Sequence, residues 1–135
     1  MTNVPERLRR TVQERAQGKC EYCLIHEDFT LLSHEPDHII AEKHGCATVA
    51  ENLAWSCTQC NRFKGSDVGS FDLVSQKFVP LFNPRTQQWK RHLKLDGPYI
   101  HPLTASGRIT VTLLKRNDIH RIDERTPFVE TGHYP

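Results

Sequence analysis

Residues 57–65 have the sequence CTQCNRFKG, and this segment decides the fold together with residues 20–23, CEYC. Each segment carries two cysteines at the CxxC spacing, and 33 residues separate Cys23 from Cys57. Two such pairs supply four thiolates, which can form the closed tetrahedral coordination of a structural zinc ion. The spacing therefore predicts one structural zinc site per chain, with the ligands Cys20, Cys23, Cys57 and Cys60.

The chain has a fifth cysteine, Cys46, and its N-terminal residues MTNVPERLRR contain no hydrophobic segment after the charges. No secretory signal is readable there, so we expect a cytoplasmic location. An odd cysteine count without such a signal argues against a disulfide framework. A redox CxxC pair and an unligated cysteine core are the alternatives to zinc. We interpret Cys46 as a small buried hydrophobic residue.

The composition is that of an ordinary globular protein. The 135 residues are 37% hydrophobic and 25% charged, which favours one folded domain over disorder. No apolar run approaches the ~20 residues needed to span a bilayer, so no membrane contact is expected. The formal net charge of +2 is too small to indicate a nucleic-acid partner by itself. Two basic clusters support such a partner, with a solvated helix face as the alternative for each: Arg7, Arg9, Arg10, Arg15 and Lys19, and then Arg85, Lys90, Arg91 and Lys94.

The hydrophobic pattern of the N-terminal half predicts helices around short strands. Apolar residues at every fourth position, Leu8, Val12 and Ala16, indicate a helix with Asn3 as its cap and Gly18 at its end. Further apolar residues flank the segment 34–38 and suggest a hairpin of short strands, namely Phe29, Leu31, Leu32, Ile39 and Ile40. A short helix is expected to start near Thr58 and to end at Gly65.

The C-terminal half reads as an extension of hairpins and helices. Residues 71–82 are rich in apolar side chains that we expect to pack. Residues 92–95 and 99–103 predict a hairpin, and a helix is expected from Thr104 or Ser106 through Leu114. A last turn or two of helix is expected over 118–125, and the tail after Pro127 is expected to be loose.

Phosphodiester hydrolysis requires a base that deprotonates water and a positive charge near the phosphorus and the leaving oxygen. A neutral histidine suits the first task at neutral pH. A divalent cation bound by hard oxygen ligands suits the second. The sequence places such groups between and beside the cysteine pairs, in Asp37-His38, Asn52 and Asn61.

In their order and spacing these residues resemble the HNH endonuclease family, in the subgroup that carries CxxC zinc knuckles. The matching pattern covers residues 20–65 and consists of Cys20-x-x-Cys23, Asp37-His38-Ile39-Ile40, Asn52-Leu53 and Cys57-x-x-Cys60-Asn61-x-x-Lys64-Gly65. The resemblance implies an α+β fold, a small single domain over 1–135 with a ββα-metal core at 18–66. An N-terminal helix and a C-terminal hairpin and helix extension at 67–135 would complete it.

The resemblance also implies a function and a role for each residue. The protein would be a divalent-metal-dependent endonuclease on DNA, double-stranded in our expectation, with Mg²⁺ or another divalent cation as catalytic cofactor. His38 would be the general base, and Asp37 and Asn61 would bind the metal ion. Asn52 would be structural, holding the loop that orients His38. Where the family usually has two glycines, this chain has Gly45-Cys46.

Simple geometry supports one part of this assignment and strains another. Zinc on Cys60 would fix the position of the adjacent Asn61. Asp37 and His38, however, point to opposite faces of a regular strand. Both can serve one site only if the strand bends or ends there, and Pro36 makes an irregularity plausible.

Each role has a simpler alternative. His38 could be a core histidine held by Asp37. Arg62 and Lys64 could contact a phosphate or complement the C-terminal end of their helix. For the whole protein, the alternatives are a zinc-ribbon-like nucleic-acid-binding module without catalysis and, more distantly, a redox protein. The oligomeric state cannot be read from the sequence.

Overall fold

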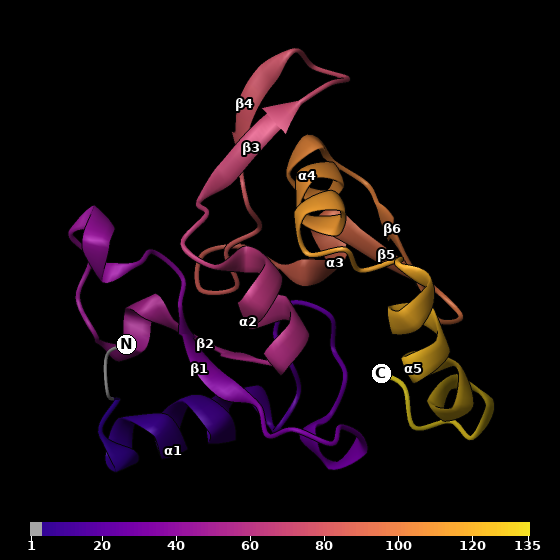
Figure 1. Cartoon of the computed structure of the whole chain (residues 1–135), viewed down its shortest axis with the longest axis horizontal. Helices are drawn as coiled ribbons and strands as arrows, with labels where there is room; N and C mark the ends of the chain where they lie inside the picture. The colour runs from indigo at the N-terminus through magenta and orange to yellow at the C-terminus, as the bar shows by residue number, and fades with distance from the viewer. Residues whose placement is uncertain (1–3) are drawn as a thin grey trace.

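The computed structural model describes residues 4–135 and has an α+β fold, as the resemblance implies. Figure 1 shows α1, β1, β2 and α2 gathered at one side of the molecule and the elements from β3 to α5 above and beside them. The elements in chain order are α1 (Glu6–Ala16), β1 (Glu35–His38), β2 (Leu53–Ser56), α2 (Thr58–Lys64), β3 (Gly69–Asp72), β4 (Lys77–Pro80), α3 (Trp89–His92), β5 (Leu93–Asp96), β6 (Tyr99–Pro102), α4 (Ala105–Leu113) and α5 (Ile119–Glu130).

The N-terminal helix α1 forms as its apolar spacing predicts. It begins at Glu6, directly after Pro5, while the predicted cap Asn3 lies outside the described residues. Val12 is its fully buried residue and packs with Leu53 and Trp55 of β2 in a small core of their own. The helix therefore covers the β1–β2 pair from one side.

β1, β2 and α2 form a ββα unit. β1 pairs antiparallel with β2, which places Asp37 opposite Ala54. α2 begins directly after β2 because the Cys57 side chain caps it and accepts a hydrogen bond from the Cys60 N–H. It ends before Gly65, whose positive φ of 52° suits glycine. The predicted helix from Thr58 to Gly65 is thus confirmed.

The predicted hairpin around residues 34–38 is wrong. Only β1 is a strand in this region, and its partner is β2, which follows after a long loop. Leu31 and Leu32 are exposed, whereas Phe29 stacks on Phe128 at a ring-centroid distance of 4.5 Å. The apolar residues near β1 therefore do not share one face of a sheet, and for this reason they did not indicate a hairpin correctly.

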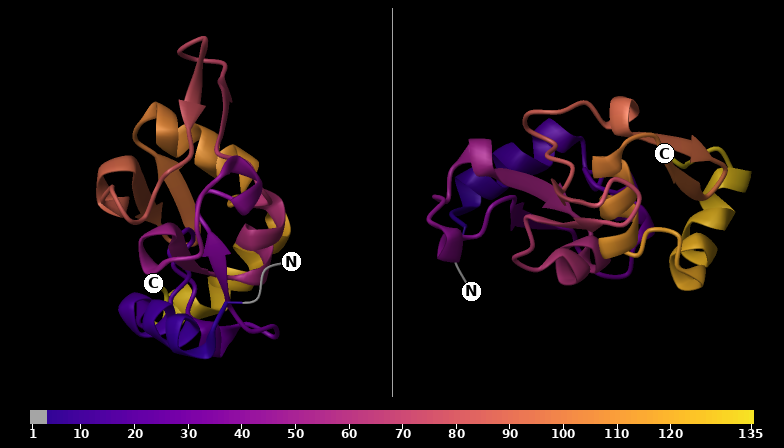
Figure 2. Two further views of the ribbon diagram at one scale, coloured as in Figure 1. Left: turned by 90° about the vertical axis from the view of Figure 1, so that its left-hand side faces the viewer. Right: turned by 90° about the horizontal axis from the view of Figure 1, so that it is seen from above.

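The extension contains a hairpin that the sequence pattern misplaced in the core. β3 and β4 form a ribbon that projects from the rest of the molecule (Figure 1, Figure 2). Helix α4 packs against the ribbon, and its Arg108 pairs with Asp72 of β3 at 2.9 Å. Four apolar side chains of the segment that we expected to pack nevertheless remain exposed: Phe71, Leu73, Val74 and Phe78. The predicted packing holds for Leu81 and Phe82, which are buried.

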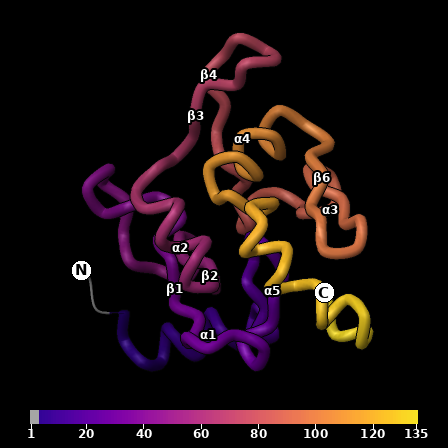
Figure 3. Tube along the Cα trace, turned by 45° about the vertical axis from the view of Figure 1, so that its right-hand side comes forward, coloured from indigo at the N-terminus to yellow at the C-terminus, as the bar shows by residue number. Residues whose placement is uncertain are grey.

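The rest of the extension follows the prediction except at its end. The β5–β6 hairpin forms, and Thr104 caps α4 by accepting a hydrogen bond from Gly107 N–H. The prediction of a loose tail after Pro127 is wrong: α5 continues to Glu130 and includes this proline. Tyr134 is buried, and its hydroxyl donates to the Cys23 carbonyl at 2.6 Å. In Figure 3 the chain can be followed through α5 to this returning tail.

Among the described residues, no helix combines the length and the apolar character that crossing a membrane requires.

Candidate zinc centre and active-site pocket

The two CxxC segments meet in one buried cluster, as the spacing predicts. Their four sulfur atoms lie within 4.8 Å of one another, and all four cysteines are buried. In each segment the second cysteine donates its backbone N–H to the first sulfur at 3.4 Å. Four convergent thiols with N–H···S hydrogen bonds are the donor set of a structural zinc site. Cys46 lies outside the cluster and is half-buried, which corrects its interpretation as a buried residue.

Two buried arginines of the C-terminal extension, Arg116 and Arg121, lie close enough to this cluster to interact with it electrostatically. Arg121 donates from Nη2 to Cys60 Sγ at 3.1 Å and to Cys57 Sγ at 3.6 Å. Arg116 is fully buried, and none of its three guanidinium nitrogens has a hydrogen-bond partner among the described residues. Four thiolates around a Zn²⁺ ion carry a formal charge of about −2, which two guanidinium groups can balance. The surroundings of the cluster thus also fit a bound zinc ion.

The positive charge of Arg121 affects the pKa of the Cys60 thiol. Burial alone raises the pKa of the Cys60 thiol. Hydrogen bonds from the other three cysteines and the charge of Arg121 outweigh burial and bring this pKa well below its ordinary value. The thiolate form, which binds metal, is therefore favoured at Cys60. The sequence analysis missed both arginines, since no local pattern links them to the cysteines.

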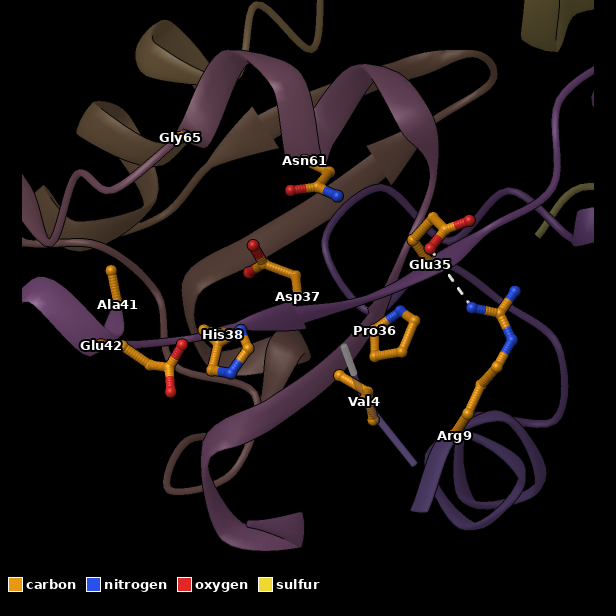
Figure 4. Close-up of a pocket in the computed structure, with 10 residues that line it drawn as sticks. All are labelled: Val4, Arg9, Glu35, Pro36, Asp37, His38, Ala41, Glu42, Asn61 and Gly65. Atoms are coloured by element: carbon orange, nitrogen blue, oxygen red, sulfur yellow. Dashed lines mark hydrogen bonds and ion pairs between the residues drawn. The ribbon is translucent and has the colours of Figure 1, made fainter. Parts of the chain in front are cut away.

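An open pocket of about 560 Å³ lies beside the zinc centre, at the end of β1. Asp37, His38 and Asn61 all line it, together with Glu42. Figure 4 shows the Asp37 carboxylate and the Asn61 amide facing each other across the gap between β1 and α2, with His38 next to Asp37 on the strand. The structure therefore brings together the base and the two metal ligands that the resemblance implies.

The conflict between neighbouring strand positions is resolved by where β1 ends. The strand stops at His38, so the pocket reaches around its end and receives side chains from both faces. Asp37 points towards α2, and His38 points away from it, beside Glu42 (Figure 4). No bend at Pro36 is needed, since Pro36 keeps its pairing opposite Trp55.

Asp37 is held by two neighbours through one of its oxygens. Its Oδ2 lies 3.2 Å from Lys64 Nζ and accepts a hydrogen bond from the Tyr22 hydroxyl at 2.9 Å. Its Oδ1 has no hydrogen bond among the described residues, so it is available to a ligand in the pocket. Burial raises the pKa of Asp37, and Lys64 and Tyr22 oppose this shift without cancelling it.

Lys64, for which we predicted either a phosphate contact or a role at the end of its helix, is buried. Its side chain is 2% exposed, and its ammonium group also donates to the His38 carbonyl at 2.9 Å and to the Gly65 carbonyl at 3.5 Å. It thus lies at the C-terminal end of α2, where its ammonium group contacts Asp37 and two backbone carbonyls. Arg62 is exposed but lines a different pocket, with Thr58 and Glu124, so it is not brought to Asp37 and His38.

Asn61 lines the pocket, whereas Asn52 lies directly before β2 and does not line it. The buried Asn52 amide accepts from the Ile40 N–H and donates to the carbonyls of Ile40 and Ala47, which ties both ends of the loop after His38 to the start of β2. Asn61 is adjacent to Cys60 in α2, and its side chain makes no hydrogen bond among the described residues. The helix that carries Cys57 and Cys60 therefore presents a free amide to the pocket.

Two arginines of the predicted N-terminal basic cluster make contacts within the protein. Arg15 donates to the backbone carbonyls of Ala50 and Leu53. Arg9, which lines the pocket, pairs with Glu35 at 3.2 Å. The N-terminal cluster is thus less available to a phosphate backbone than its formal charge indicates.

Comparison with known families agrees with this geometry. The family model described as HNH endonuclease matches residues 20–67, which include both cysteine pairs, Asp37, His38 and Asn61. No curated protein and no solved structure gives a significant match to the chain.

Proposed function

From the HNH endonuclease domain that residues 20–67 form, we propose that this protein is a divalent-metal-dependent endonuclease that hydrolyses phosphodiester bonds in double-stranded DNA. The observation that carries the proposal is the meeting of Asp37, His38 and Asn61 in one open pocket beside the four-cysteine cluster. An imidazole, a carboxylate oxygen and an amide oxygen are the groups that water activation and the binding of a hard cation require.

His38 acts as the general base in this proposal. It takes a proton from a water molecule, whose oxygen then forms a bond to the phosphorus while the bond to the leaving oxygen breaks. Asp37, through its free Oδ1, and Asn61, through its amide oxygen, would hold the divalent cation. When bound, that cation supplies positive charge for the phosphate and for the leaving oxygen.

The neighbours of these groups have supporting roles. Lys64 and Tyr22 hold Asp37 Oδ2 and so direct Oδ1 towards the pocket. Asn52 fixes the loop after His38 through its three hydrogen bonds. The zinc centre performs no chemistry in this scheme, but it anchors the helix that carries Asn61.

Plasmid cleavage tests the proposal. The purified protein should nick or linearise supercoiled plasmid in the presence of Mg²⁺ or Mn²⁺ and should be inactive in excess chelator. His38→Ala should lose at least about 100-fold in rate, the lower end of a general base's contribution. His120→Ala, at an exposed histidine on α5, is the matched control and should cleave like the wild type.

Two results would count against the proposal. Undiminished cleavage by His38→Ala would remove the base. Salt-sensitive DNA binding without cleavage under any divalent metal would favour a binding module that keeps the fold of a nuclease.

A further inference from the structure

His38 takes part in a short chain of hydrogen bonds with Thr48 and Glu42. Its Nε2 lies 2.8 Å from Thr48 Oγ1. The Thr48 hydroxyl in turn donates to Glu42 Oε2 at 3.3 Å. All three residues belong to β1 or to the loop between β1 and β2.

The donors and acceptors in this chain determine where the protons lie. A hydroxyl has one proton to donate, and an ionised carboxylate can only accept. Because the Thr48 proton points to Glu42, the Thr48 oxygen is left as an acceptor towards His38. The contact at 2.8 Å then requires a proton on Nε2, and a neutral imidazole with that proton carries its free lone pair on Nδ1.

We propose that Thr48 and Glu42 are positioning residues that hold His38 in the tautomer with Nε2 protonated and Nδ1 free to accept a proton from water. The proposal rests on the assignment of His38 as the general base. In catalytic triads a carboxylate orients the histidine and fixes its tautomer. Here the Glu42 carboxylate would do the same through the Thr48 hydroxyl group.

The fold keeps this chain of groups in place. Asn52 donates to the Ala47 carbonyl directly before Thr48, and it also binds the Ile40 backbone shortly after His38. Glu42 begins a single helical turn, Glu42–His44, which ends at Gly45 with φ of 92°. Glu42 lines the same pocket as His38.

The orientation of Glu42 and His38 agrees with a positioning role for Glu42. Figure 4 shows both side chains on the same side of the ribbon, away from Asp37 and Asn61. Asp37 contacts Lys64, which does not line this pocket. Nδ1 of His38 has no hydrogen-bond partner among the described residues.

The ¹⁵N chemical shifts of the imidazole nitrogens test the tautomer directly, without any nuclease assay. The protein has eight histidines, so the His38 signals are assigned by their absence from the His38→Ala spectrum. At about pH 8, where an ordinary imidazole is neutral, the wild type should show a protonated Nε2 and an unprotonated Nδ1. A protonated Nδ1 would overturn the proposal.

Three variants separate positioning from general structure. Thr48→Val removes the acceptor and should give a mixture of the two tautomers and about a tenfold loss in cleavage rate, less than the loss of the base itself. Thr48→Ser keeps the hydroxyl and should restore both. Thr112→Val, at an exposed threonine of α4, is the matched control and should change neither.

The outcomes distinguish this inference from the proposed function. The expected wild-type tautomer without metal-dependent cleavage would contradict the nuclease and leave the tautomer assignment standing. Cleavage that depends on His38, combined with an unchanged tautomer in a folded Thr48→Val, would contradict the positioning role alone. Zinc content and the thermal unfolding midpoint show that each variant is folded.

Discussion

Arg121 Nη2 donates a hydrogen bond to Cys60 Sγ at 3.1 Å, although the two residues are 61 positions apart in the sequence. The same guanidinium donates from Nη1 to the Leu114 carbonyl at 2.6 Å. Arg121 is 1% exposed, so its charge has the cysteine cluster in place of water as its surroundings. The C-terminal extension is thereby attached to the zinc centre by charge as well as by apolar packing.

Replacing Arg121 should destabilise the whole domain. Arg121→Leu removes one partner of a buried charge pair, and we expect a loss of about 3–5 kcal/mol in the free energy of unfolding. Urea unfolding, followed by tryptophan fluorescence, measures this loss. Zinc should also transfer faster to a chelator. Arg91→Leu, at an exposed arginine, is the control, and equal stability of the two variants would show that the Arg121 contact contributes nothing.

Zinc removal should unfold the N-terminal half. About one equivalent of zinc should co-purify with the chain, and a strong chelator should abolish cooperative melting, because the metal-binding energy of such sites is folding energy. Cys57→Ser should behave like the chelated protein. Cys46→Ser changes a cysteine outside the cluster and should keep both zinc and the melting transition. A zinc-free protein that still melts cooperatively would contradict a structural metal.

These features differ in how far the sequence reveals them. The CxxC pairs are short-range patterns, and the coordination number of zinc requires two pairs to meet, so the centre could be predicted from spacing. The start of α2 near Thr58 and its end at Gly65 are also local features, and the structure confirms both. Arg116 and Arg121 carry no local signature, because only the packing of the extension brings them to the cysteines.

The predictions that the structure contradicts failed because long-range contacts decide these parts of the fold. Apolar residues around β1 suggested a hairpin, but periodicity does not reveal that the partner strand is β2, which follows a long loop. Several apolar side chains of the β3–β4 hairpin are exposed, and the tail after Pro127 is anchored by the hydrogen bond from Tyr134 to the Cys23 carbonyl. Each outcome was decided by long-range contacts, which a local pattern does not contain.

The Asp37–Lys64 pair should show strong coupling in a double-mutant cycle. Both side chains are almost completely buried, and their charged groups lie 3.2 Å apart. Lys64→Met leaves the Asp37 carboxylate without its cation and should lower the free energy of unfolding by about 3–5 kcal/mol.

The double variant Asp37→Asn/Lys64→Met should recover part of this loss, because no charge then remains without a partner. Urea unfolding of the four proteins with zinc bound gives the coupling energy. Strictly additive effects of the two changes would mean that the contact between the two groups does not stabilise the fold.

Alkaline pH should weaken the anchoring of the C-terminal tail. Burial and the nearby Cys23 hold the pKa of the Tyr134 hydroxyl well above its usual range. The phenol is therefore neutral in the folded protein at a pH where the unfolded chain has lost the proton. The folded state then binds more protons than the unfolded state, so stability falls as the pH rises above about 10, the ordinary tyrosine pKa.

Tyr134→Phe isolates this effect. At neutral pH the variant should be less stable by about 1 kcal/mol, because it lacks the hydrogen bond to the Cys23 carbonyl. Above about pH 10 the difference should shrink and then reverse, since phenylalanine has no proton to lose. Tyr99→Phe, at an exposed tyrosine in β6, is the control and should follow the wild type at every pH. A constant difference between Tyr134→Phe and the wild type from pH 7 to about pH 11 would contradict a buried Tyr134 hydroxyl.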